Sequence, residues 1–221
     1  MTGRSRGPRF LVFEGGEAVG KSTQAARLAG RIDALLTREP GGTAVGAAVR
    51  ALMLDPGTAG LDDRAEALLM AADRAQHVAE VVRPALDAGR HVVSDRYIGS
   101  SLAYQGFGRG LPVDQLRRLS SWASGGLWPD VAVLLDAPPD VTAARVAGRP
   151  DRVEAAGVEF HQRVVDGYRA LAAADPDRWA VVDACADADA VEAAVWKAVI
   201  TRCPELAVVA PGPAGPAERP R

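Results

Sequence analysis

The chain has 221 residues, 48% of them hydrophobic, and its 26 basic and 28 acidic residues give a formal net charge of −2. This length suits one domain with a substantial core, and the near-zero mean hydropathy is that of an ordinary globular protein. No basic surplus points to nucleic acid, and no apolar run approaches the ~20 residues of a membrane span. Cys185 and Cys203 have neither metal-site nor disulfide spacing. The basic start leads into a short strand-like run rather than a signal peptide, so we expect a cytoplasmic protein that binds neither membrane nor nucleic acid.

Short apolar segments alternate with longer amphipathic stretches, which is the pattern of a parallel sheet flanked by helices. Strands are expected at residues 9–14, 34–37, 90–94, 131–136 and 179–183. Helices are expected to begin at Lys21, Thr43, Asp62, Val113, Pro139, Val158 and Asp187. The longest helix is expected over residues 62–87, where apolar side chains recur about every 3.6 residues. The sequence therefore predicts an α/β fold in three layers with a five-stranded parallel sheet.

The two ends of the chain differ in composition from its centre. Residues 1–8 are expected to be a flexible segment, and residues 9–203 are expected to form the domain. Proline, glycine and alanine dominate residues 204–221, so we expect a disordered tail there.

Residues 15–22 read Gly-Gly-Glu-Ala-Val-Gly-Lys-Ser, which fits the P-loop pattern G-x-x-x-x-G-K-[ST] between an apolar strand and a helix. Glycines let backbone amides turn toward an anion, and the helix N-terminus adds partial positive charge. Lys21 would contact the β and γ phosphates of ATP, and the Ser22 hydroxyl would bind Mg²⁺. Lys21 and Lys197 are the only lysines of the chain, so lysine at this position is not incidental. The expected ATP-binding residues are Gly15, Gly16, Glu17, Ala18, Val19, Gly20, Lys21, Ser22 and Thr23, within a P-loop NTPase fold.

A P-loop alone does not separate kinases from ATPases and GTPases, which use water as acceptor. A kinase needs further cations that hold a second anionic substrate. Arg38 and Arg96 at strand ends, and Arg74 inside the long helix, are the candidates. Arg38 could instead lie in a surface turn, and Arg74 could lie on a solvated helix face. Asp95 suits contact with Mg²⁺, and Asp136 is a weaker candidate for the metal.

Two further stretches complete the predicted site. The stretch with Ser100, Ser101, Tyr104 and Gln105 offers the hydroxyls, phenol and amide that reading a sugar and a pyrimidine would use, although Tyr104 could instead be a core residue. Residues 146–157 are interrupted by glycine and proline, and the segment is bracketed by arginines. This composition is expected of a lid that excludes water and brings cations to the transferred phosphoryl group. A solvated charged loop is the alternative. The arginines are Arg145, Arg149, Arg152 and Arg163.

Together, these motifs resemble the bacterial thymidylate kinases, which are P-loop nucleoside monophosphate kinases. The resemblance extends from Phe10 to about Cys203. It is carried by residues 13–15 and 20–24, by Thr-Arg-Glu-Pro-Gly-Gly-Thr at 37–43, by 72–77, by Asp-Arg-Tyr at 95–97, by 101–106 and by Asp-Arg-Val-Glu at 151–154. Each motif is modest alone, but their order and spacing are specific.

The resemblance implies a homodimer that uses ATP and Mg²⁺ to phosphorylate dTMP to dTDP in dTTP synthesis. It implies that Glu17 lies near the acceptor 3′-hydroxyl, that Arg74 and Arg96 bind the monophosphate, and that Tyr104 favours deoxyribose. The expected acceptor-binding residues are Glu17, Arg38, Met70, Arg74, Arg96, Ser101, Tyr104 and Gln105.

The P-loop has no arginine or lysine between Gly15 and Gly20, so this variant of the family is expected to take its catalytic cation from the lid, from Arg149 or Arg152. The expected catalytic residues are therefore Lys21, Arg96, Arg149 and Arg152.

Met70 departs from the family, which usually stacks an aromatic ring on thymine at this position. A thioether can pack on a π-face with ~0.3–1.5 kcal/mol, so base binding could persist with altered selectivity. One alternative is a kinase for another nucleoside or nucleotide. The other is a regulatory protein that binds ATP without transferring phosphate. The helix expected over residues 62–87 is a candidate dimer interface.

Overall fold

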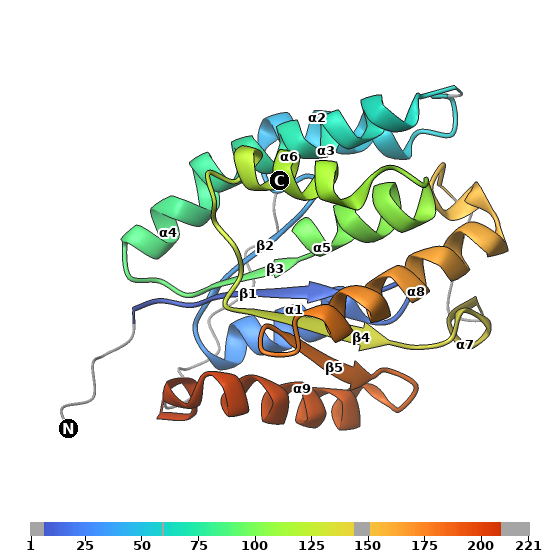
Figure 1. Cartoon of the computed structure of the whole chain (residues 1–221). Helices are drawn as coiled ribbons and strands as arrows, with labels where there is room; N and C mark the ends of the chain where they lie inside the picture. The colour runs from blue at the N-terminus through green and yellow to red at the C-terminus, as the bar shows by residue number, and fades with distance from the viewer. Residues whose placement is uncertain (1–6, 59, 144–150, 209–221) are drawn as a thin grey trace.

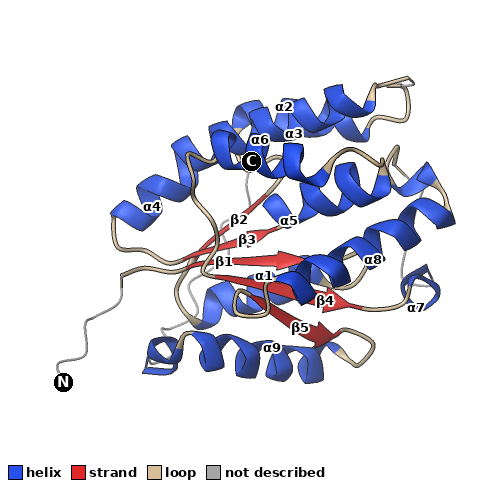
Figure 2. Cartoon of the chain, viewed as in Figure 1, coloured by secondary structure: helices blue, strands red, loops and turns tan. Residues whose placement is uncertain are grey.

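The computed structural model describes residues 7–58, 60–143 and 151–208, and Figure 1 shows the path of the chain. One sheet lies at its centre, with helices on both faces (Figure 2). Its strand order is β2-β3-β1-β4-β5, and every neighbouring pair is parallel. The predicted fold class is thereby confirmed. The strands are β1 (Phe10–Glu14), β2 (Leu35–Arg38), β3 (Val92–Asp95), β4 (Val131–Asp136) and β5 (Trp179–Asp183).

Helices cover the two faces unequally. Two helices, α1 and α9, pack on one face, and α3, α5, α6 and α8 pack on the other (Figure 1). The helices are α1 (Lys21–Arg31), α2 (Ala44–Leu54), α3 (Asp63–His77), α4 (Arg83–Asp87), α5 (Ile98–Ser101), α6 (Val113–Ala123), α7 (Pro139–Ala143), α8 (Val158–Ala174) and α9 (Ala188–Arg202). Among the described residues, no helix is both long and apolar enough to cross a bilayer.

The central strand β1 explains why two cores form. All five of its residues are buried, and alternate side chains point to opposite faces of the sheet. Leu11 and Phe13 belong to the core beneath α1 and α9, while Phe10 and Val12 belong to the core on the other face. A strand covered on both faces reads as a continuous apolar run, which is the signal that predicted it.

The helix predicted over residues 62–87 is helical throughout but not uniform. A π-helical segment, Val78–Val82, separates α3 from α4. Pro84 has no backbone N–H to donate, so the regular hydrogen-bond ladder cannot continue through the start of α4.

The buried face of α3 is not the one that the apolar repeat indicated. Leu68 of that repeat is 59% exposed, whereas Glu66, Asp73, Arg74 and His77 are buried. These polar side chains can turn inward because each has a hydrogen-bond partner outside α3.

Two regions differ from the sequence-based expectation. Helix α5 and the π-helical segment Leu102–Gly108 that follows it were not predicted.

At the C-terminus, Pro204–Val208 forms a 3₁₀-helix in which Leu206 is 1% exposed, so the ordered chain extends beyond residue 203. Glu205 also forms an ion pair with Arg9 at 2.5 Å, which ties this helix to the start of β1.

Candidate active site

The P-loop joins the end of β1 to the start of α1, and two glycines allow its turn. Gly15 has φ +142°, and a Cβ there would lie 2.5 Å from the carbonyl oxygen of Leu135. Gly20, at the N-cap of α1, is left-handed with φ 90°. Side-chain-bearing residues rarely adopt these conformations, so the motif's glycines are required by the path of the chain. Lys21 Nζ donates to Gly16 O at 2.5 Å, so the loop curls around this ammonium group.

A cavity of about 340 Å³ opens beside this loop. Acidic and basic side chains from β2, α2 and β3 complete its wall. Val19 lies instead in the core, 4% exposed, and Gly15 and Gly16 are not part of the lining. The lining residues are Glu17, Ala18, Gly20, Lys21, Ser22, Thr23, Arg38, Glu39, Arg50, Asp95 and Arg96.

The electrostatics of the loop follow from burial beside other charges. Burial, and then the nearby Arg96, lower the pKa of Lys21 to about 8. Burial would raise the pKa of Glu17, but Arg96 and Lys21 outweigh it and lower that pKa to about 2. Glu17 is therefore a carboxylate at neutral pH.

Ser22 and Asp95 have the donor chemistry that Mg²⁺ takes. Ser22 Oγ donates to Asp95 Oδ2 at 2.5 Å, so a hydroxyl and a carboxylate meet at the cavity. Asp95 Oδ1 is shielded from solvent and has no hydrogen-bond partner in the described part of the chain. Oxygen donors with capacity to spare fit a hard divalent cation that takes its remaining ligands from phosphate and water. Asp136, the weaker candidate, pairs instead with Arg169 at 3.0 Å.

Arg96 is the most extensively bonded side chain of the site. Its backbone is left-handed, with φ 70°, and its guanidinium reaches the P-loop. Nη2 donates to Glu17 at 2.8 Å and to Tyr104 OH at 3.1 Å. Nη1 donates to Gly15 O at 3.0 Å. Tyr104 OH also donates to Glu17, which closes a ring of three side chains.

A second, smaller cavity adjoins the first. Met70, Tyr104 and Gln105, three of the residues expected to bind the acceptor, line it together, and Glu17, Arg50 and Arg96 line both cavities. The two cavities therefore meet at one carboxylate and two guanidinium groups.

Arg74 occupies a different place from the predicted one. It is 0% exposed and lines neither cavity. Its guanidinium donates to Glu39 at 3.0 Å, to Ser101 Oγ at 3.0 Å and to Tyr97 O at 3.2 Å. Arg74 thus fixes Glu39, which lines the P-loop cavity, and Ser101 faces this buried cluster rather than a cavity.

The lid arginines are only partly visible. Arg145 and Arg149 lie outside the described residues. Arg152 donates to Met53 O at 2.8 Å and to Glu66 at 2.7 Å, so it bonds to α2 and α3 and lines neither cavity. Its neighbours Asp151 and Val153 do line the second cavity.

The structure adds residues that sequence reasoning missed. Arg50 lines both cavities, and burial, followed by Arg38 and Arg96, lowers its pKa, so three cations converge there. One signal was available: Arg50 is the only charged residue of the otherwise apolar helix α2. Of the two serines in the predicted stretch, Ser100 lines the second cavity and the preferred candidate Ser101 does not. Glu66 bonds Gln105, Arg109 and Arg152, and no motif indicated it.

Comparison with known proteins agrees with this geometry. A family profile described as thymidylate kinase matches residues 13–195. The chain is 52% identical over 204 residues to the thymidylate kinase of Solidesulfovibrio magneticus, covering 86% of this chain and 98% of that one. It is 47% identical over 206 residues to that of Bifidobacterium longum, covering 90% and 98%.

A solved structure is also similar. The crystal structure of thymidylate kinase from Ehrlichia chaffeensis matches with a TM-score of 0.72 and 30% identity, covering 88% of this chain and 99% of that one. The resemblance predicted from the sequence is therefore confirmed, and the chain belongs to the thymidylate kinase family.

Proposed function

We propose that this chain transfers the terminal phosphoryl group of ATP to dTMP, giving ADP and dTDP. The observation that carries this proposal is the junction of two cavities at Glu17, Arg50 and Arg96. One cavity has a P-loop for the donor, and the other has an apolar and amide lining for a nucleoside. Two phosphates brought together at such a junction repel each other, and guanidinium groups offset that repulsion.

On the donor side, the P-loop amides and Lys21 would hold the ATP phosphates. Ser22 and Asp95 would hold Mg²⁺, which offsets phosphate charge when bound. Arg38, exposed at the end of β2 and without a hydrogen-bond partner among the described side chains, would add positive charge at the same cavity.

On the acceptor side, Arg96 and Arg50 would bind the monophosphate. A phosphate monoester oxygen is already an anionic nucleophile, so no general base is required. Tyr104, Gln105 and Met70 would contact the nucleoside. Glu17, ionised and bonded to Tyr104, would accept a hydrogen bond from the sugar hydroxyl.

We assign Arg152 a positioning role through its neighbours Asp151 and Val153. Its two bonds to Met53 O and Glu66 fix this segment against α2 and α3. Arg152→Ala should then raise the KM for dTMP more than it lowers kcat. A loss confined to kcat would instead support the catalytic role expected from the sequence.

We further propose a homodimer formed through the outer helices. Leu68 on α3 is 59% exposed and Trp122 on α6 is 81% exposed, and Val45 and Leu52 on α2 are 51% and 45% exposed. Large exposed apolar side chains on neighbouring helices suit a protein interface. Sedimentation of the Leu68→Glu variant should show a shift to monomer. A dimer unaffected by this variant would place the interface elsewhere.

An acceptor panel tests the proposed activity. ADP formation is measured with ATP, Mg²⁺ and one acceptor at a time: dTMP, dUMP, dCMP, ribothymidine monophosphate or thymidine. The proposal predicts the highest kcat/KM with dTMP. A higher value for another acceptor would change the substrate, and an ADP release rate that no acceptor increases would refute phosphoryl transfer.

A further inference from the structure

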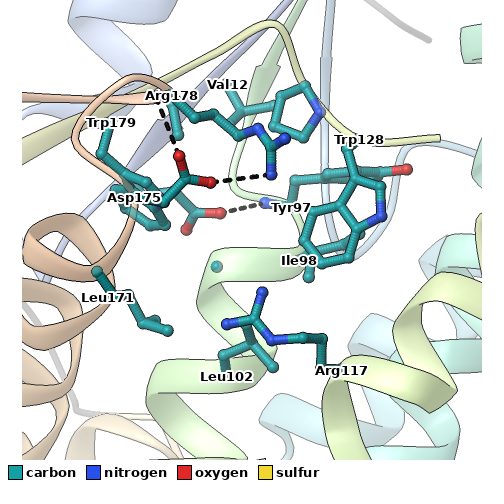
Figure 3. A pocket seen from close by; sticks show the side chains of 15 residues that line it. Val12, Tyr97, Ile98, Leu102, Arg117, Trp128, Leu171, Asp175, Arg178 and Trp179 are labelled. Atoms are coloured by element: carbon teal, nitrogen blue, oxygen red, sulfur yellow. Dashed lines mark hydrogen bonds and ion pairs between the residues drawn. The ribbon is translucent and has the colours of Figure 1, made fainter. Parts of the chain in front are cut away.

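A third cavity, of about 280 Å³, lies on the sheet face covered by α6 and α8, and its lining includes no residue that lines the two cavities of the active site. Its walls come from β1, from the segment around α5, from the turn before β4 and from the turn between α8 and β5 (Figure 3). Nothing in the proposed reaction uses this space.

The chemistry of its lining is specific. Trp128 has two cations near its ring: Arg117 Cζ is 5.7 Å from the ring centroid, and Arg178 Cζ is 5.5 Å from it. Both guanidinium groups point into the space beside the indole (Figure 3). Leu171 and Leu102 add apolar walls.

The two arginines are not equally neutralised. Arg178 forms an ion pair with Asp175 at 3.1 Å. Arg117 has no carboxylate within ion-pair distance and no hydrogen-bond acceptor in the part of the chain that the structure describes. A ligand with an acidic group would supply that partner, and a flat ring would pack against the indole and the leucines.

One stretch of chain lines this cavity with some of its residues and the active site with others. The third cavity is lined by Tyr97, Ile98, Gly99 and Leu102. The second cavity, which the proposed function assigns to the acceptor, is lined by Arg96, Ser100, Tyr104 and Gln105 from the same stretch of chain. We therefore expect a ligand that displaces one side of this segment to displace the other.

Glu14 strengthens the connection. It lines the third cavity and accepts hydrogen bonds from Tyr97 N at 3.1 Å and from Ser100 Oγ at 2.7 Å. Arg96 Nη1 in turn donates to Ser100 Oγ at 3.3 Å and to Tyr168 OH at 3.2 Å. Two hydrogen bonds thus separate the wall of this cavity from the arginine of the acceptor site.

We propose that this cavity binds a small planar aromatic acid, and that its occupancy changes the affinity of the acceptor site. The volume is slightly below the ~300–1,000 Å³ of sites for drug-sized ligands, so one or two fused rings is the fitting size. The binding part does not depend on the proposed function, whereas the coupling part rests on it.

Calorimetric titration of the full chain with naphthalene-2-sulfonate tests the binding part, with neutral naphthalene-2-sulfonamide as the matched probe. We expect one saturable site and about tenfold tighter binding of the sulfonate. Arg117→Gln should weaken sulfonate binding about tenfold, and Trp128→Leu should weaken both probes. Arg118→Gln, an exposed neighbour on α6 outside the lining, should change neither. Equal affinity for the two probes, no saturable binding, or an unaffected Arg117→Gln variant would overturn the site.

Steady-state kinetics test the coupling part. The KM for dTMP should shift with sulfonate concentration and reach a plateau, because two ligands on separate sites alter each other's affinity by a fixed factor. A KM that rises without limit would mean direct competition for the acceptor site. A KM that stays constant while the probe is bound would refute coupling and leave the binding result standing.

Discussion

Replacing Arg96 by alanine removes one of the two guanidinium groups at which the active-site cavities meet. The side chain contacts Glu17 at 2.8 Å, Gly15 O at 3.0 Å and Tyr104 OH at 3.1 Å, and only 15% of it is exposed. Truncating one member of a buried, hydrogen-bonded charge pair costs about 2–5 kcal/mol. If that loss falls on the bound acceptor phosphate, kcat/KM for dTMP should fall roughly 30- to 5,000-fold.

The assay separates the acceptor from the donor. ADP formation is followed at saturating ATP with dTMP varied, and ATP affinity is measured by equilibrium binding without acceptor. Arg96→Lys keeps the charge but loses the planar fork, so it should fall between the native enzyme and Arg96→Ala. Arg118→Ala, on the outside of α6, is the control. An Arg96→Ala enzyme with a normal KM for dTMP would refute the assignment, and equal loss of ATP affinity would place Arg96 on the donor side.

Three further predictions follow from the same structure. Because the pKa of Lys21 is about 8, kcat/KM for ATP should fall above about pH 8 as the ammonium loses its proton. The Lys21→Arg variant, whose guanidinium does not titrate in this range, should lose this dependence. Identical pH profiles for the native and Lys21→Arg enzymes would contradict the assignment. Burial, and then Glu39, raise the pKa of Asp73 from 3.8 to about 6, so its ionisation destabilises the fold by up to about 3 kcal/mol as pH rises through that window. Denaturant unfolding should therefore show Asp73→Asn gaining stability over the native chain at pH 7.5 but not at pH 4; equal effects at both pH values would count against this. Gly15→Ala places a Cβ 2.5 Å from Leu135 O at φ +142°. The substitution should lower the free energy of unfolding by about 1–3 kcal/mol or more and weaken ATP binding. An unchanged Tm would contradict the claim that this turn requires glycine.

Much of the fold and the donor site could be predicted because their signals are local. The strands at 131–136 and 179–183 were predicted with the bounds of β4 and β5, since each is a short run bounded by polar residues. The P-loop is one contiguous stretch, so its glycines, Lys21 and Ser22 could be identified before their geometry was known.

The rest depends on contacts between distant segments. Arg74 reads as a helix residue facing a cleft, but its partner Glu39 is 35 positions away, and only the folded chain brings them together. Ser100 replaces Ser101 at the cavity because α5 turns each successive residue to a different face, and neither α5 nor the π-helical segment after it had a periodic signal. Arg152 was expected to act on phosphate. Its hydrogen bond to Glu66, 86 positions away, could not be predicted from the sequence around either residue.

Transfer of labelled phosphate tests the central claim most directly. The chain is incubated with ATP labelled at the γ position, Mg²⁺ and dTMP, and the products are separated. The proposed function predicts that the label moves to dTDP, at a rate that depends on dTMP concentration and is strongly reduced in Arg96→Ala. Label recovered as inorganic phosphate at a rate independent of dTMP would contradict it.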